Sequence, residues 1–320
     1  LLGFVYAISV QLFVQPELIE GNEIILEKTY THHTNEVWEV KFAPNDTLMI
    51  SGGIEQNTKI WNRITGEVIH NLPHEIGSPS VDFNAKGNIA ATGAYDGKVR
   101  LWDVKSGKIL KTLEGNKGTI WSVNFCPNGE LIAAGSDDDK VTIWNIKLGR
   151  IMYEFTEATH NIWEVVFNHT GEFLAASGSD NAIRIYNVKT GKLIKTLLAH
   201  SMVPLSMDFS PNGKLLASAG DDKTIKIWDT ENWKLLHTLV GENEAIHSVV
   251  FVGNDKVLAG GTDKNMLGEL LEYHLNFKGF VKPITATLWN IKSETILQTI
   301  SSHSDDVGLG IDVSSDGKLI

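Results

Sequence analysis

One short motif recurs along this chain at a nearly constant interval and limits what the chain can fold into. In each copy an Ile or Leu precedes an aromatic residue, and an Asp or Asn follows it. The aromatic residues of the six copies are Trp61, Trp102, Trp144, Tyr186, Trp228 and Trp289. Successive separations are 41, 42, 42, 42 and 61 residues, so the last interval is one period with an insertion of 19 residues. A period of roughly 40–45 residues is typical of a repeat unit with four short strands.

Each period contains the same parts in the same order. An apolar strand such as VWEVKF leads to a second strand such as LLASAG, and an acidic turn precedes the strand that carries the aromatic residue. A turn such as VKSG then leads to a fourth strand such as KILKTL. Gly and Asn in the turns allow the positive φ that chain reversal needs, and alternating Val, Ile and Leu give each strand a buried face. The sequence therefore predicts an all-β fold of four-stranded antiparallel units.

Charge and cysteine content narrow the classes of function. The chain has 28 Lys and Arg against 39 Asp and Glu, a formal net charge of −11, with no cluster of basic residues. Nucleic-acid binding relies on neutralising phosphates, so we expect no nucleic acid among the partners. The one cysteine, Cys126, has no second thiol for a disulfide or a zinc site, and we interpret it as a small apolar residue beside a strand.

The repeated residues resemble the WD-repeat family of β-propellers, and the resemblance extends over residues 22 to 320. It implies a hydrogen-bonded tetrad in each blade, formed by a His before the first strand, a Ser or Thr on the second, an Asp in the next turn and the Trp. Complete sets are His74, Thr92, Asp96 and Trp102, and His200, Ser218, Asp222 and Trp228. Partial sets are His33, Ser51, Glu55 and Trp61 in blade 1, Asn116, Asp138 and Trp144 in blade 3, Asp180 and Tyr186 in blade 4, and Asp263 and Trp289 in blade 6.

The resemblance also implies a seven-bladed ring of four-stranded antiparallel blades over residues 21–320. Six blades are expected near residues 33–72, 74–113, 116–155, 158–197, 200–239 and 242–300, and the start of a seventh at 303–320. In this family the N-terminal strand, here 22–30, completes the last blade and removes open sheet edges. The sequence stops within the second strand of blade 7, so we expect that blade to be incomplete, as in a truncated chain.

Residues 1–20 form an apolar segment ahead of the repeats, with two interpretations. No charged residue precedes Glu17, which favours the end of a signal or anchor at residues 1–15 and an exported or envelope-associated protein. Ile8, Val10, Leu12 and Val14 alternate as in a half-buried strand, so residues 6–14 could instead supply the third strand of blade 7 in a cytoplasmic protein. A membrane contact is expected only through such an anchor, and the oligomeric state is left open.

The insertion, residues 264–282, interrupts the turn between the second and third strands of blade 6. Its sequence LLEYHLNFKGFV favours a strand hairpin over a helix, either as a cover for the ring or as a partner contact. No hydrolase, zincin, Walker or dinucleotide-binding motif occurs. We therefore expect no enzyme and no cofactor, and we interpret the acidic turns and the pair His32 and His33 as structural rather than as metal ligands.

One position of each first strand is expected at the rim of the central channel, with the residue before the tetrad Asp beside it. In the family these positions often contact partner proteins. The rim residues are Trp38, Pro79, Trp121, Trp163, Leu205 and His247, with Tyr95, Asp137, Ser179, Asp221 and Thr262 beside them. Aromatic residues ringed by acids suit a protein or peptide partner of basic character. The alternative is a purely structural role, in which the tryptophans only close the channel mouth.

The sequence therefore predicts a non-catalytic scaffold that binds a protein or peptide on the propeller rim. Three alternatives stay open at this point. They are a module of a longer multidomain protein, an exported binding protein, and an enzyme that uses the central channel as its active site.

Overall fold

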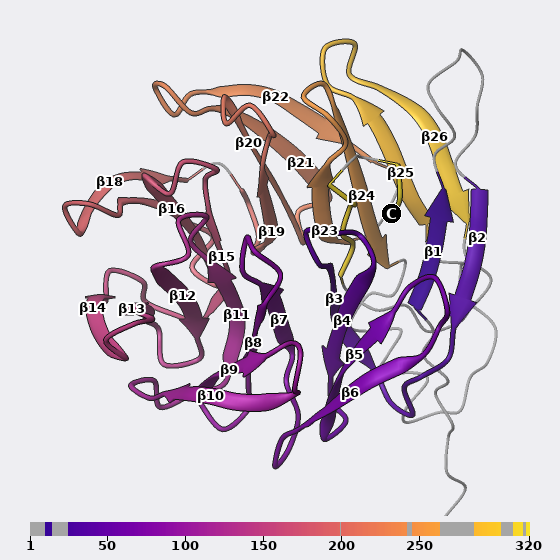
Figure 1. Ribbon diagram of the computed structural model, residues 1–320. Coiled ribbons are helices and arrows are strands. Elements are labelled where there is room, and N and C mark those ends of the chain that lie inside the picture. The colour runs from indigo at the N-terminus through magenta and orange to yellow at the C-terminus, as the bar shows by residue number, and fades with distance from the viewer. Residues whose placement is uncertain are drawn as a thin grey trace, which may run out of the picture.

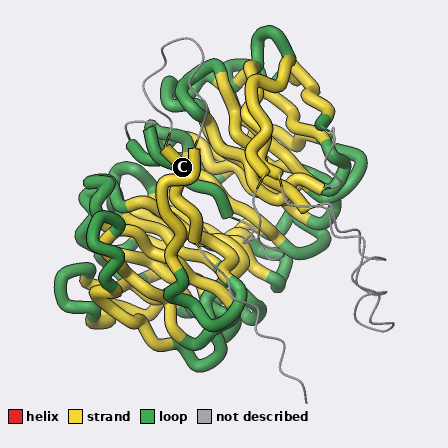
Figure 2. The backbone as a smooth tube through the Cα atoms, turned by 90° about the vertical axis from the view of Figure 1, so that its right-hand side faces the viewer, coloured by secondary structure: helices red, strands yellow, loops and turns green. Residues whose placement is uncertain are grey.

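The computed structural model describes residues 10–14, 25–198, 200–241, 245–262, 285–301, 310–315 and 318–320. Over these ranges the chain forms strands and turns and no helix, as the yellow and green tube of Figure 2 shows. A helix with the length and hydropathy of a membrane span is accordingly not found in these ranges. The expected all-β fold is confirmed.

Six four-stranded antiparallel sheets surround a common centre, each with its strands in sequential order (Figure 1). The first strands, nearest the centre, are β3 (Val37–Phe42), β7 (Ser80–Phe83), β11 (Ile120–Phe125), β15 (Ile162–Phe167), β19 (Pro204–Phe209) and β23 (Ala245–Phe251). The second strands are β4 (Leu48–Gly53), β8 (Ile89–Gly93), β12 (Leu131–Ser136), β16 (Phe173–Gly178), β20 (Leu215–Gly220) and β24 (Lys256–Thr262). The third strands are β5 (Asn57–Asn62), β9 (Val99–Asp103), β13 (Val141–Asn145), β17 (Ile183–Asn187), β21 (Thr224–Asp229) and β25 (Thr285–Asn290). The fourth strands, at the periphery, are β6 (Val68–Pro73), β10 (Lys108–Leu113), β14 (Arg150–Phe155), β18 (Lys192–Leu197), β22 (Leu235–Val240) and β26 (Thr295–Ser301).

The repeated aromatic residue of each third strand packs into the preceding blade. Trp102 lies in a buried cluster with Ile60 and Leu72 of blade 1, and Trp144 lies in one with Leu101 of blade 2. Both indoles are 1% exposed. A side chain of this size buries roughly 150–250 Å² and dominates the packing around it. Each repeat of the sequence therefore supplies one aromatic residue that packs its blade against the preceding one.

The second strands carry small residues because the next blade approaches them closely. A Cβ built on Gly93 would lie 2.5 Å from Cγ2 of Ile120, and one built on Gly135 would lie 2.5 Å from Cγ2 of Ile162. No real Cβ atom tolerates that distance, so each glycine makes room for the first strand of the following blade. Small second strands and large third-strand aromatics together set the distance between blades.

A belt of side-chain hydrogen bonds joins neighbouring first strands. The inner edge of a first strand has no neighbour in its own sheet, so its N–H groups need other acceptors. Ser80 Oγ accepts the N–H of Val123 at 2.9 Å, and Ser122 Oγ accepts that of Val165 at 3.1 Å. The same bond runs from Val81 to Glu39, from Met207 to Glu164, from Val249 to Ser206 and from Ile311 to Ser248.

A second layer of this belt lies two residues further along each strand. Its acceptors are Asp82, Asn124, Asp208 and Asp312. They accept the N–H groups of Phe125, Phe167, Phe251 and Phe42, each on the following blade, at 2.6 to 2.8 Å. We call the two layers the channel belt, because they run around the central channel from blade to blade.

Residues 310–315 occupy the seventh position of the ring, between β23 and β3. Ser248 Oγ accepts the N–H of Ile311 at 3.0 Å on one side, and Asp312 Oδ2 accepts the N–H of Phe42 at 2.6 Å on the other. Ile311 also packs on the core of blade 6, and Leu319 packs on that of blade 1. The expected seven-bladed ring with an incomplete seventh blade is confirmed.

The N-terminal strands β1 (Val10–Val14) and β2 (Ile25–Tyr30) pair in an antiparallel two-stranded sheet. Figure 1 shows this sheet between β26 and blade 1, and Tyr30 packs on Trp61 with ring centroids 4.5 Å apart. Residues 10–14 thus adopt the strand that was the alternative to a signal segment, while export itself stays a prediction. Asp263 and the insertion at 264–282 lie outside the described residues.

Replacing Asp312 with Ala should destabilise the ring where it closes. The substitution removes the acceptor of the Phe42 N–H and a carboxylate that lies 3.9 Å from Lys41 Nζ. A buried donor left without an acceptor costs about 1–3 kcal/mol, and we expect urea denaturation to show a loss of that order. Asp255→Ala, in an exposed turn of blade 6, is the control and should retain wild-type stability. Equal stability of Asp312→Ala and the wild type would contradict the closing role of the belt.

Candidate functional site

A β-bulge near the start of the first strand places one residue at the channel rim. In β11 the pairing passes from Ile120 with Ser136 to Ser122 with Gly135, so Trp121 has no partner on β12. The same register shift occurs at Trp38, Trp163, Leu205 and His247. A bulged residue leaves the ladder, and its side chain is re-aimed. Five of the six expected rim positions, all but Pro79, therefore coincide with a repeated backbone feature that no sequence pattern marks.

Trp38, Trp121 and Trp163 form one continuous cluster, which we call the aromatic wall. Trp121 lies between the other two, with its ring centroid 5.7 Å from that of Trp38 and 5.1 Å from that of Trp163. Trp38 and Trp121 belong to blades 1 and 3, and they meet because blade 2 has the short, buried Pro79 at this position. Tyr95 adds an edge-to-face contact with Trp121 at 5.9 Å.

Hydrogen bonds orient two of these indoles. Trp121 Nε1 donates to Asp137 Oδ1 at 2.9 Å, and Trp163 Nε1 donates to Ser179 Oγ at 2.7 Å. Asp137 and Ser179 each precede the tetrad Asp position, so in blades 3 and 4 the two kinds of expected rim residue are brought together. The three tryptophans are partly exposed. The wall is thus a pre-oriented aromatic surface at one end of the channel, which we call the upper mouth.

Leu205, His247 and Asp221 line the rest of the upper mouth. Burial raises the pKa of Asp221, against the lowering effect of His247. The side chain of Thr262 lies outside the described residues. The mouth is therefore asymmetric, because aromatic side chains form one part of it and a leucine, a histidine and a carboxylate form the other.

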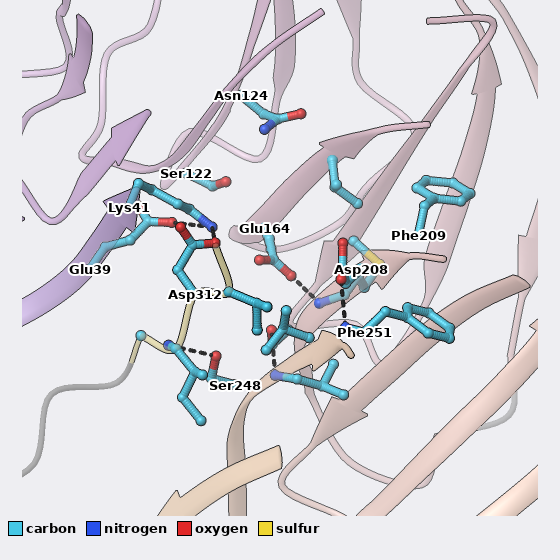
Figure 3. A pocket seen from close by; sticks show the side chains of 18 of the residues that line it. Glu39, Lys41, Ser122, Asn124, Glu164, Asp208, Phe209, Ser248, Phe251 and Asp312 are labelled. Atoms are coloured by element: carbon cyan, nitrogen blue, oxygen red, sulfur yellow. Dashed lines mark hydrogen bonds and ion pairs between the residues drawn. The ribbon is translucent and has the colours of Figure 1, made fainter. Parts of the chain in front are cut away.

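Below the mouth lies a cavity of about 890 Å³ whose inner wall carries charged groups (Figure 3). Lys41 Nζ lies 3.6 Å from Glu39 Oε1 and 3.9 Å from Asp312 Oδ1. Burial would lower the pKa of Lys41, but the Asp312 and Glu39 carboxylates raise it above its usual value. Glu164 and Asp208 line the same cavity from β15 and β19. Lys41 also acts on Asp82 of β7, so the charge of one ammonium group acts on five carboxylates around the channel.

Glu164 and Asp208 have no ion pair among the described residues. Burial raises the pKa of Glu164 well above its usual range and that of Asp208 to about 7, against the attraction of Lys41. Neither residue was a sequence candidate. The repeat frame could have found them, because acidic residues recur at the third and fifth positions of the strand that reads VWEVKF in blade 1.

The tetrad of blade 5 is assembled in full. His200 Nε2 lies 2.7 Å from Ser218 Oγ, and His200 Nδ1 lies 3.0 Å from Asp222 Oδ2. Trp228 Nε1 donates to the same Ser218 Oγ at 2.9 Å. Both nitrogens of the buried imidazole therefore have partners, and the four side chains connect three parts of the blade.

Blade 2 differs from the expectation although it has the same four residue types. Trp102 Nε1 donates to Thr92 Oγ1 at 2.9 Å, and the ring of His74 lies 5.6 Å from that of Trp102. Both ring nitrogens of His74 are buried without a partner, because Asp96 pairs instead with Arg100, whose Nη1 lies 3.1 Å from Oδ1. Burial and the charge of Arg100 lower the pKa of His74 to about 4.

The other blades keep parts of the tetrad. In blade 1 Glu55 takes the role of the Asp, with Oε1 at 2.9 Å from His33 Nδ1. In blade 3 Asn116 Nδ2 donates to Asp138 Oδ1 at 3.0 Å. In blade 4 Asp180 Oδ2 lies 2.6 Å from Nη2 of Arg184. No group of three or more His, Cys, Asp or Glu side chains suited to a metal ion occurs within the described ranges.

The closed ring of four-stranded sheets, with its inter-blade aromatics and tetrads, defines a β-propeller built from tryptophan-centred repeats. The family model "WD domain, G-beta repeat" matches residues 25–62, 66–103 and 191–229, and "Anaphase-promoting complex subunit 4 WD40 domain" matches residues 123–209. Together the matches cover more than half of the chain. The chain belongs to the WD-repeat family of β-propellers, whose members are generally non-catalytic protein-interaction scaffolds.

Curated members of the family match parts of the chain. The F-box-like/WD repeat-containing protein TBL1X of Homo sapiens is 29% identical over 133 residues, which cover 36% of this chain and 23% of that protein. The small ribosomal subunit protein RACK1 of Caenorhabditis elegans is 34% identical over 87 residues, 26% of this chain and 27% of that protein. The COMPASS component SWD3 of Saccharomyces cerevisiae is 30% identical over 91 residues, 28% of this chain and 29% of that protein. The chain thus spans less than a third of each relative's length.

Acid should destabilise the protein through His74. Its pKa is about 4 in the folded chain against 6.5 as the unperturbed value, so between these pH values the unfolded state binds a proton that the folded state does not. Stability is therefore lost as the pH falls from 6.5 to 4, by roughly 3 kcal/mol for this group. The variant His74→Gln should lose less unfolding free energy than the wild type over this range, as measured by urea denaturation. Parallel pH curves for the two proteins would show that His74 is not the titrating group.

Proposed function

We propose that this protein is an interaction scaffold that binds a protein or peptide segment of basic character at the upper mouth of its propeller. The aromatic wall carries the proposal. Tryptophan and tyrosine dominate binding hot spots because they bring a large contact area at a low cost in conformational entropy. The contacts of Trp121 with its two neighbouring indoles and with Asp137 reduce that cost further, because the ring is oriented before a partner arrives.

The charge of the mouth supports a basic partner. The chain has a formal net charge of −11, and Asp137 and Asp221 lie beside the rim residues. Carboxylates around an apolar contact surface steer an oppositely charged partner and disfavour an acidic one. The partial exposure of the three tryptophans favours binding over a role confined to closing the channel.

Peptides selected from a random peptide-display library against the wild-type protein should depend on the aromatic wall. We expect Trp121→Ala to weaken the selected peptides at least tenfold, about 1.4 kcal/mol, because it removes the central indole of the wall. Affinities would be measured by fluorescence anisotropy with labelled peptides. The melting temperature should change little, since the rim indoles are partly exposed whereas Trp102 and Trp144 hold the blades together.

Leu148→Ala is the matched control for this experiment. Leu148 is an apolar residue of the same blade, is 56% exposed, and lies in the turn after β13, at the opposite end of the blade from Trp121. It should leave peptide affinity unchanged. Equal loss in both variants, or peptides that bind Trp121→Ala as tightly as the wild type, would reject the rim site. Unfolding of Trp121→Ala would assign the indole a packing role instead.

A further inference from the structure

Two carboxylates in the first layer of the channel belt hold a position at which four other blades use a neutral side chain. In the first layer the acceptors are serines in four blades, Ser80, Ser122, Ser206 and Ser248. Glu39 and Glu164 take the same position in the other two. A serine hydroxyl supplies the acceptor that the neighbouring N–H needs, so the belt does not require a charge at either glutamate.

The two glutamates differ in what balances their charge. Glu39 lies 3.6 Å from Lys41 Nζ. Glu164 accepts the N–H of Met207 and has no ion pair among the described residues. The ionised form of Asp208, on the first strand of the next blade, contributes to the raised pKa of Glu164. Burial raises the pKa of Glu164 although Lys41 attracts it from beyond ion-pair distance. Holding this carboxylate ionised away from water costs free energy that no direct cationic contact among the described residues offsets.

Glu164 also has a distinctive place relative to the rim. It directly follows Trp163 on β15, and both residues line the cavity of about 890 Å³. Figure 3 shows Lys41 directed at Asp312, while Glu164 and Asp208 are bonded to neighbouring backbone and not to a cation. A long cationic side chain that entered from the upper mouth would pass the faces of the indoles before it reached this carboxylate. Aromatic faces attract cations, and a carboxylate then forms strong charge-assisted hydrogen bonds with them.

We propose that the upper mouth admits one basic side chain of the bound segment, an arginine or a lysine, whose cationic head is held by Glu164 beneath the aromatic wall. The inference rests on the proposed function and adds a subsite to it. The wall supplies contact area for the segment, and Glu164 selects the residue that enters the channel. Asp208 strengthens the negative field there while it keeps its own bond to the Phe251 N–H.

The subsite can be tested with small probes that need no knowledge of the partner. N-acetylarginine amide and N-acetyllysine amide carry the cation, and N-acetylcitrulline amide is a neutral match for the arginine probe. We expect both cationic amides to shift the indole N–H resonances of Trp121 and Trp163 saturably, with dissociation constants in the millimolar range of about 1–10 mM for such small ligands. The citrulline amide should bind at least tenfold more weakly.

Two variants at one position assign the effect to the charge. Glu164→Gln keeps an oxygen acceptor for the Met207 N–H, and Glu164→Ser copies the arrangement of the four serine blades. Both should remain folded, with melting temperatures at or above that of the wild type, and both should weaken the cationic probes at least tenfold. Asp255→Asn, which removes a charge at the opposite end of the same cavity, should leave probe affinity unchanged.

The pH dependence gives a readout that a merely structural role of Glu164 would not move. Lys41 and Glu39 on β3 and Asp208 on β19 are the charged groups that act on Glu164, and burial raises its pKa. Because the ionised form holds the cation and burial raises the pKa of Glu164, the affinity for the arginine probe should rise with pH well above the range in which an exposed glutamate ionises. Glu164→Gln should flatten that rise.

Three outcomes would overturn the subsite. They are equal binding of the arginine and citrulline amides, no binding of either cationic amide at about 50 mM, and unchanged affinity in both Glu164 variants. If displayed peptides depend on Trp121 while these probes fail, the rim function stands and the basic side chain is rejected. If the probes bind at Glu164 while no displayed peptide depends on Trp121, the cation subsite stands and the rim function is rejected.

Discussion

The inner edge of each first strand has no neighbouring strand, and the centre of this ring is organised around that constraint. Unpaired N–H groups at a sheet edge need acceptors if they are withdrawn from water. Here side chains of the preceding blade supply them, as Ser80 does for Val123 and Asp312 does for Phe42. Each blade therefore depends on the one before it, and the dependence is complete only when the ring closes through residues 310–315. Hydrophobic packing of Trp102 and Trp144 between sheets sets the spacing at which these short bonds form.

The same strands that hold the belt also build the upper mouth. After the bulge, the third and fifth residues face the channel and join the belt, while the bulged residue is left at the rim. Trp121 and Ser122 are consecutive, yet one belongs to the aromatic wall and the other to the belt. A change in register that moved the bulge would therefore disturb both the closure of the ring and the binding surface. Stability and the proposed recognition are thus coupled within a few residues of backbone.

Much of the fold follows from the sequence because the decisive contacts repeat. The interval between Trp102 and Trp144 predicts the blade length, and the alternation of apolar residues predicts four strands in each blade. The bulge beside Trp121 leaves no pattern in the sequence, because it depends on the pairing partner of Ile120 and not on its identity. The contact between Trp38 and Trp121 depends on the small Pro79 in the intervening blade. The failure of His74 to meet Asp96 reflects a competition that Arg100 wins, since a bidentate charged pair outweighs a hydrogen bond to a neutral ring.

Most carboxylates of the channel either replace a missing hydrogen-bond acceptor or pair with Lys41, and Glu164 is the exception. Asp82, Asp208 and Asp312 stand in the blades that follow Lys41, Val166 and Val250, side chains that accept no hydrogen bond. Asp82 compensates with both oxygens, accepting the Phe83 N–H of its own strand at 2.8 Å and the Phe125 N–H of the next blade at 2.7 Å. The N–H groups of Phe209 and Val313 act on Asp208 and Asp312 in the same way. Three carboxylates therefore replace acceptors that the preceding blade lacks, and Glu39 balances Lys41. Glu164 is then the one carboxylate of the described belt that stands at a serine position and makes no direct ion pair with Lys41. Local conflicts of this kind in a folded protein are expected at functional sites, and this one lies next to Trp163.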